Sequence, residues 1–114
     1  MPTLNVNITA ISGSTGTYDR ASGPGTVASN GDIDFRGSGA SAAVDIAWTL
    51  ANELGKTFSS DGFSAGSTSE FSNVTLSNAN KTLTVTDAND PGQQYEYSLT
   101  LSDGTVLDPK IINR

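Results

Sequence analysis

The sequence predicts an all-β fold, a single antiparallel β-sandwich of about seven to nine short strands with Greek-key connections, spanning residues 1–114. Three observations predict it. Several segments alternate apolar and polar residues with period two, and Asn-Gly or Asp-Gly pairs stand between such segments. Serine and threonine number 29 and glycine 12, which suits outward strand faces and turns.

The first strand follows from strict alternation over Leu4–Ala10, which places Leu4, Val6 and Ile8 on one face. The glycine-rich stretch Gly13–Gly25 is either a long loop or a weak edge strand. Asn30-Gly31 then separates Thr26–Ser29 from Asp32–Phe35. It predicts a hairpin with a type I′ turn, which needs positive φ at both central residues.

Two Asp-Gly pairs predict two further hairpins. One pair, Asp61-Gly62, lies between Phe58 and Phe63. The other, Asp103-Gly104, lies between the apolar-alternating residues 97–101 and 105–107. Three such pairs in a short chain favour antiparallel pairing throughout.

Two C-terminal segments predict strands with one buried face. In Thr82–Thr86, Leu83 and Val85 point inward and the threonines outward. In Tyr95–Leu101 the inward residues are Tyr95, Tyr97, Leu99 and Leu101.

The segment Ala40–Leu54 is ambiguous. Its alanines and leucines fall at helical spacing, and Gly55 would cap such a helix. With period two, Val44, Ile46, Trp48 and Leu50 form an equally good strand face. The β-branched residues and the surrounding strands favour a strand, with the helix kept as the alternative.

Aromatic residues and the C-terminus refine the prediction to an immunoglobulin-like sandwich. Trp48 would fill the centre between the sheets, and Tyr95 or Tyr97 would hydrogen-bond back to a loop. Pro109 has no N–H, so it confines the last strand to an edge or a bulge. We expect Asp108 to accept hydrogen bonds from a neighbouring loop, and Ile111 and Ile112 to pack against the core.

Three C-terminal segments together resemble a known family. They are Lys81–Asp90, Tyr95–Leu101 and Asp108–Asn113. Two earlier segments, Trp48-Thr49-Leu50 and Asp61-Gly62-Phe63, also match the same family pattern. Residues 44–114 resemble the DP-EP family of small bacterial β-sandwich proteins of unassigned function. The resemblance implies a bacterial source and a sandwich fold but no catalytic residues, and residues 1–40 show none.

Composition excludes several function classes. Histidine and cysteine are absent, which removes imidazole bases, thiol nucleophiles, disulfides and sites for zinc or copper with nitrogen or sulfur ligands. The six basic residues are scattered singly in a chain of net charge −6, so we expect no nucleic-acid and no membrane partner. The N-terminus lacks a signal-peptide pattern, which predicts a cytoplasmic protein.

Three patterns imitate catalytic or cofactor sites. Gly62–Gly66 matches the G-x-S-x-G serine elbow, but the serine has no base. Gly37–Ala42 imitates a dinucleotide loop without the crossover helices of a parallel sheet. Asp32 and Asp34, with Asp45, resemble a glycosidase carboxylate pair, but alternation places all three on an outer, solvated face. We therefore predict that the chain is not an enzyme and binds no organic cofactor, keeping an enzyme as the least favoured alternative.

One loop has the oxygen ligands that Ca²⁺ prefers. Asp87, Asn89 and Asp90 follow a strand directly and form a candidate metal site, although the same residues are ordinary turn formers.

Two hypotheses about function follow. The leading one is a non-catalytic binding module whose sheet edges accept a strand from a protein partner or from a second copy in a homo-oligomer. The alternative is a calcium- or glycan-binding accessory domain that uses residues 87–90 with exposed Phe63 or Phe71. A flat, solvent-facing row of rings would favour sugar, whereas buried rings beside a bare strand edge would favour protein.

Overall fold

The computed structural model describes residues 1–40, 42–66 and 68–114. The elements are β1 (Thr3–Ser12), β2 (Thr15–Ser22), β3 (Thr26–Val27), β4 (Ile33–Asp34), β5 (Val44–Leu50), the 3₁₀ turn η1 (Asn52–Leu54), β6 (Phe58–Ser64), β7 (Phe71–Ser77), β8 (Thr82–Asp87), β9 (Gln94–Glu96), β10 (Ser98–Leu101), β11 (Val106–Leu107) and β12 (Lys110–Ile112).

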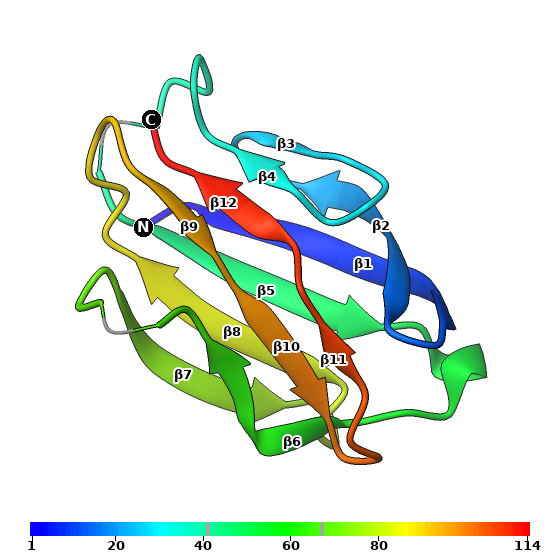
Figure 1. Ribbon diagram of the computed structural model, residues 1–114. Helices are drawn as coiled ribbons and strands as arrows, with labels where there is room; N and C mark the ends of the chain where they lie inside the picture. Colours follow the sequence, from blue (N-terminus) through cyan, green and yellow to red (C-terminus); the bar gives the residue numbers. More distant parts are fainter. Residues whose placement is uncertain (41, 67) are drawn as a thin grey trace.

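The strands form two layers (Figure 1). One layer is a five-stranded sheet of order β2-β1-β5-β8-β7. The other joins two sheets, of order β3-β4-β12-β9 and β11-β10-β6, because β9 leads directly into β10 and β11 into β12. The predicted all-β sandwich is confirmed, whereas its immunoglobulin-like subtype stays a prediction.

Two details of the predicted architecture were wrong. The pairs β1/β5 and β4/β12 are parallel, so the fold is not antiparallel throughout. The described residues also form twelve strands rather than seven to nine. The run 94–101 is divided at Tyr97 into β9 and β10, and the run 106–112 is divided at Asp108-Pro109 into β11 and β12. The first forty residues contribute four strands.

Trp48 lies at the centre between the layers, as predicted, and is fully buried. Its ring centroid is 5.1 Å from that of Tyr97, and its Nε1 donates a hydrogen bond of 3.2 Å to the Tyr97 hydroxyl. That hydroxyl in turn donates to the Gly31 carbonyl at 3.0 Å. The predicted tyrosine bond to a loop is therefore confirmed for Tyr97, and it ties the N-terminal region to the core.

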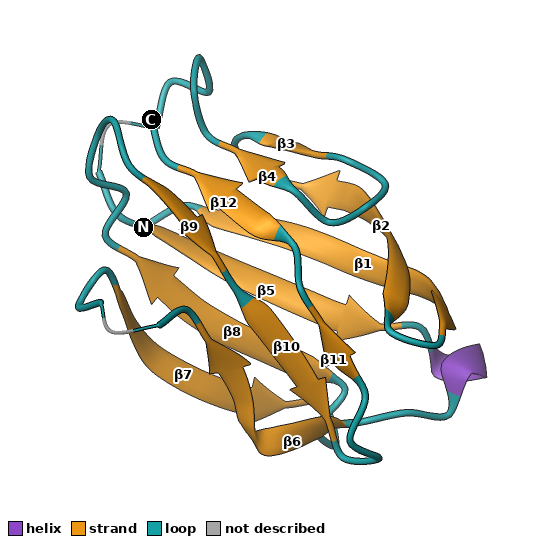
Figure 2. Ribbon diagram, viewed as in Figure 1, coloured by secondary structure: helices purple, strands orange, loops and turns teal. Residues whose placement is uncertain are grey.

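The ambiguous segment forms a strand. Val44–Leu50 is β5, with Val44, Ile46, Trp48 and Leu50 buried as period two requires. The helical spacing accounts only for the short 3₁₀ turn η1, drawn in purple in Figure 2. Gly55 caps it at φ +63°, donating its N–H to Asn52. No helix in the described part of the chain is both long and apolar enough to cross a membrane.

Two of the three predicted hairpins are present, but with another turn type. At both Asn30-Gly31 and Asp103-Gly104, only the glycine has positive φ, at +95° and +92°. The glycine N–H bonds back to Ala28 in the first turn and to Leu101 in the second. A type I turn followed by a left-handed glycine fits this pattern better than the predicted type I′ turn.

The hairpin predicted at Asp61-Gly62 is wrong, because β6 continues through both residues. Gly62 is buried against β8, and a Cβ there would lie 2.8 Å from Leu83 Cδ1 and 2.9 Å from the Ser59 carbonyl oxygen. The register toward β10 shifts here, from Leu99↔Phe63 to Leu101↔Phe58. This glycine therefore permits close packing at a bulge instead of a chain reversal.

Near the N-terminus, Leu4, Val6 and Ile8 are buried as predicted. The stretch Gly13–Gly25 contains β2, which confirms the edge-strand alternative over the loop.

The last strand corrects another expectation. β12 is not an edge strand, since it lies between β4 and β9. Pro109 instead occupies the break before β12, where its carbonyl accepts the Tyr97 N–H at 3.0 Å. Asp108 accepts a hydrogen bond of 2.6 Å from Ser98, a strand residue and not a loop residue. Ile111 is fully buried and Ile112 half-buried.

Candidate functional site

The two halves of the run Gln94–Leu101 have different neighbours. β10 lies between β11 and β6 and is paired on both sides. β9 pairs with β12 on one side, and its other side faces no strand of the described chain. The reason is that β6 ends at Ser64, which pairs with Ser98, the first residue of β10.

The backbone of β9 directs hydrogen-bonding groups toward this open side. The Gln93 carbonyl accepts the Asn113 N–H at 2.9 Å, and the Tyr97 N–H bonds to Pro109, so both odd-numbered residues face β12. Groups of successive strand residues point to opposite sides. Gln94 and Glu96 therefore present two N–H and two C=O groups at the open edge.

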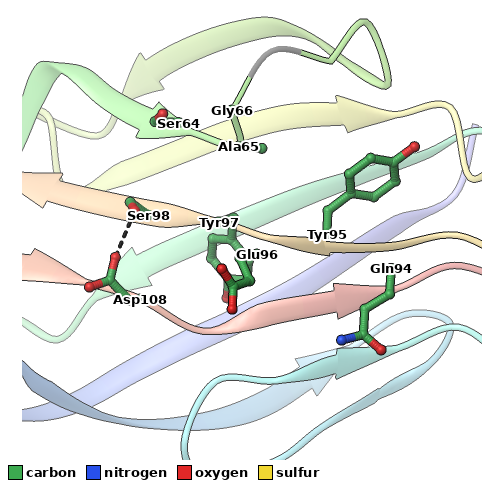
Figure 3. A pocket seen from close by; sticks show the side chains of 9 residues that line it. All are labelled: Ser64, Ala65, Gly66, Gln94, Tyr95, Glu96, Tyr97, Ser98 and Asp108. Atoms are coloured by element: carbon green, nitrogen blue, oxygen red, sulfur yellow. Dashed lines mark hydrogen bonds between the residues drawn. The ribbon is translucent and has the colours of Figure 1, made fainter.

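A groove of about 600 Å³ runs along this edge (Figure 3). Ala65 and Gly66, where the chain leaves β6, form its opposite wall. Two carboxylates, those of Glu96 and Asp108, are exposed in it. The described residues that line the groove include no lysine or arginine.

The inner side of the same edge is aromatic. Tyr95 packs edge-on against Phe71 of β7 at 5.4 Å and 81°, and Phe71 packs against Phe63 at 5.2 Å and 60°. An adjoining hollow of about 260 Å³ lies against Phe63, Phe71, Ala65 and Val74. The rings are half-buried and mutually inclined, so Phe63 and Phe71 do not form the flat exposed row expected of a glycan site.

The predicted calcium ligands are not gathered around one open position. Asp87 and Asn89 are fully buried, whereas the Asp90 side chain is exposed. Both ends of the Asn89 amide are used, since Nδ2 donates to Ala42 and Oδ1 accepts from the Arg114 N–H. Within the described residues, no group of three or more acidic side chains is placed to hold a metal. Calcium binding stays a prediction.

Asp87 instead joins a buried cluster with Glu70 and Asn113. Burial raises the pKa of Asp87 from 3.8 to about 7, the N–H of Asn89 opposes this shift, and the charge and hydrogen bond of Glu70 add to it. Oδ2 of Asp87 has no donor among the described residues, and a proton on Asp87 lets it donate to Glu70. Glu70 also accepts from Asn113 Nδ2 at 2.8 Å. Sequence spacing gave no signal for this cluster.

The segments that resemble a serine elbow and a dinucleotide loop do not form such sites in the described residues. Ser64 ends a strand and is followed by a loop to β7, not by the helix that a serine elbow needs. Ser41 of the Gly37–Ala42 loop lies outside the described residues.

The three candidate carboxylates are likewise separate. Asp34 is on β4 and Asp45 on β5, in different layers. All three, including Asp32, are half-buried and not on a fully solvated face. The hydrogen bond from Arg36 holds the pKa of Asp34 below its ordinary value, which the sequence did not predict.

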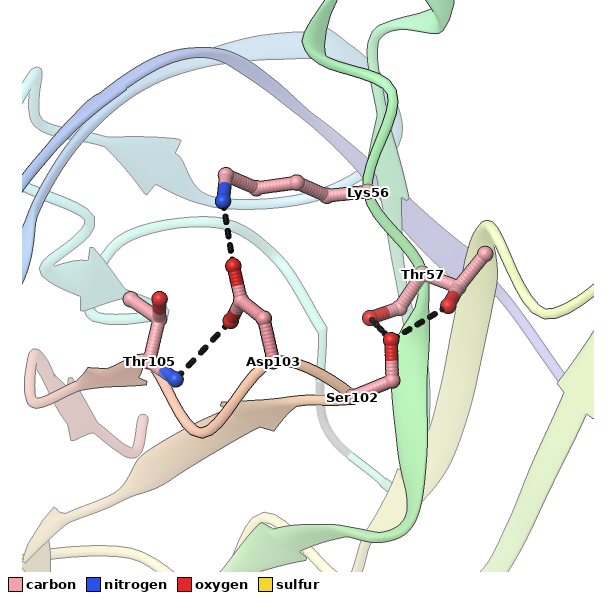
Figure 4. A network of polar contacts seen from close by, with 5 residues as sticks. All are labelled: Lys56, Thr57, Ser102, Asp103 and Thr105. Atoms are coloured by element: carbon pink, nitrogen blue, oxygen red, sulfur yellow. Dashed lines mark hydrogen bonds and ion pairs between the residues drawn. The ribbon is translucent and has the colours of Figure 1, made fainter.

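A polar network fixes the far end of β10 (Figure 4). Lys56 forms an ion pair with Asp103, and the Thr57 and Ser102 hydroxyls lie 2.7 Å apart. Asp103 also accepts the Thr105 N–H at 3.0 Å. The Lys56 hydrogen bond holds the pKa of Asp103 well below its usual range.

Comparison with known proteins finds no matching model of a protein family and no matching curated protein. The resemblance of residues 44–114 to the DP-EP family therefore stays a prediction.

Proposed function

We propose that this chain is a non-catalytic interaction module that accepts an extended segment of a partner protein as an added strand beside β9. The observation that carries the proposal is the edge at Gln94 and Glu96, which pairs with no strand of the described residues and opens into the groove. Strand addition uses such unpaired main-chain groups for affinity and neighbouring side-chain pockets for specificity.

Inclined, half-buried rings beside an open edge support a protein ligand over a sugar. The strand order also supports the immunoglobulin-like interpretation. β5, β8 and β7 share one sheet while β6, β10 and β11 share the other, as expected for a Greek-key sandwich.

Other edges are less suited to strand addition. β7 carries a register shift between Ser72 and Thr75, with Asn73 at φ +57°, and the pairing of β1 with β2 carries two register shifts. β6, the outer strand of its sheet, has a register shift opposite Leu99 and Leu101. Bulges of this kind twist an edge away from a flat partner. β3 and β11 are only two residues long.

The test is an NMR titration of the ¹⁵N-labelled chain with a short capped peptide that alternates valine and threonine. We expect the largest amide shifts at Ala65, Gly66, Gln94 and Glu96. A peptide N-methylated at every residue, which has no main-chain N–H to donate on either side, and the variant Gln94→Pro should both abolish the shifts. If no extended peptide shifts these amides, the proposal fails.

Sedimentation of the free chain over a range of concentrations comes first. A dimer that Gln94→Pro dissociates would mean that a second copy, not a partner protein, occupies the edge.

A further inference from the structure

The two faces of the β9 edge differ in chemistry. Gln94 and Glu96 are exposed on the outer face, while Tyr95 turns inward onto Phe71. Directly opposed residues of paired strands share a face. A segment added beside β9, in either direction, therefore places alternate side chains over these two faces.

The outer face is acidic at the groove. Glu96 and Asp108 are both exposed, and the described groove residues supply no positive charge. Lys110 of β12 is the register partner of Glu96 but forms no ion pair with it. A lysine or arginine directly across from Glu96 would gain a favourable cross-strand pair, whereas an acidic residue there would be repelled.

The inner face carries apolar side chains and has room. Tyr95 packs against Phe71 there. The adjoining hollow is lined by Phe63, Phe71, Ala65 and Val74 together with Ser64, Gly66 and Thr68, and Val74 is 44% exposed. A side chain projecting inward from the added segment would reach this hollow. An apolar side chain there would bury surface that the chain alone leaves in water.

We infer that the partner segment alternates basic and apolar side chains, with basic residues opposite Gln94 and Glu96 and an apolar residue opposite Tyr95. This inference rests on the proposed function and names the chemistry of its ligand. The occupant is a basic, extended protein segment, which complements the groove and a chain of net charge −6.

The test compares three short capped peptides in which valine alternates with lysine, threonine or glutamate, using NMR titration of the intact chain. The lysine peptide should bind most tightly, by about two- to fivefold for each charge placed opposite the groove. Its advantage should disappear at about 1 M salt, where exposed charges are screened. A fourth peptide with the same lysines and valines in two blocks should lose the advantage, because it cannot present alternate faces.

A charge-reversed variant tests the assignment to β9. In Glu96→Lys, which changes an exposed side chain, the order of lysine and glutamate peptides should invert. The matched control is Glu53→Lys, which changes the net charge equally at exposed η1. Glu53→Lys should keep the lysine preference.

The outcomes separate the two proposals. If all three peptides shift the β9 amides equally, strand addition stands and the basic ligand is wrong. If Glu53→Lys inverts the preference as well as Glu96→Lys, net charge and not the groove causes it, and the inference is again overturned. If no peptide shifts these amides, the proposed function itself is wrong.

Discussion

β9 and β10 are two halves of one run of alternating residues, yet they occupy opposite situations. β10 is paired on both sides and closed by the Lys56–Asp103 hairpin network. β9 is paired on one side only. Just before it, the Gln93 carbonyl accepts the N–H of Asn113, whose side chain belongs to the buried Asp87 cluster. The comparison teaches that a strand becomes an edge because its neighbour ends, not because its own sequence differs.

A proline substitution in β10 should lower the free energy of unfolding far more than one in β9. This difference is the largest effect we expect. Ser98→Pro removes an N–H directed at β6 and should lower the free energy of unfolding by about 3 kcal/mol or more. Gln94→Pro removes an N–H that faces the groove and should cost less than about 1 kcal/mol. Urea unfolding measures both, and equal losses would contradict the open edge.

The stability of the region before β9 and the stability of the hairpin after β10 should also change with pH in opposite directions. Asp87 has a raised pKa in the fold, so the folded chain binds its proton more tightly than the unfolded chain. Stability should therefore fall as pH rises from about 4 to about 7, by about 2–4 kcal/mol. Asp87→Asn, which mimics the neutral form, should flatten this fall in melting temperature.

The control variant is Asp90→Asn, which removes an exposed carboxylate from the same loop and should keep the slope. Asp103 has a lowered pKa, so its contribution is present above about 4 and is lost as pH falls further. Hydrogen exchange should thus show the hairpin after β10 opening in acid and the residues before β9 opening at neutral pH. An unchanged slope in Asp87→Asn would show that another group causes the pH dependence.

The two tyrosines of the run sharpen the comparison with a smaller effect. Tyr97→Phe leaves the Trp48 indole N–H without its acceptor and the Gly31 carbonyl without its donor, at a cost of about 1–3 kcal/mol. The Tyr95 hydroxyl makes no hydrogen bond with the described residues, so Tyr95→Phe should change stability by less than about 0.5 kcal/mol. Thermal unfolding of both variants checks this, and a comparable loss in Tyr95→Phe would contradict it.

Alternation was sufficient to predict the inward residues of β5, β8 and β10 and the central position of Trp48. It was not sufficient to predict where β6 ends. Asp61-Gly62 has the composition of a turn, and only the close contact of Gly62 with Leu83 shows why the strand continues. The open edge of β9 follows from the end of β6 at Ser64 and is a tertiary property.

The buried acidic cluster was unpredictable for a related reason. The sequence indicated Asp87 as a calcium ligand because Asn89 and Asp90 follow it closely. In the structure its partners are instead Glu70, before β7, and Asn113, after β12. Nothing in the local sequence links residues so far apart. Pairing of β7 with β8 and of β12 with β9 brings them together.

The central place of β12 has a kinetic consequence. Its Lys110 N–H bonds to Asp32, 78 positions earlier, and its residues pair with strands from both halves of the chain. Contacts so distant in sequence require large loops to close before they add any stability, and such topologies fold in milliseconds to seconds. Until β12 docks, β4 and β9 each lack a partner on the side it fills. We therefore expect chains in which β12 has not yet docked, and not the native chain, to be most prone to aggregate.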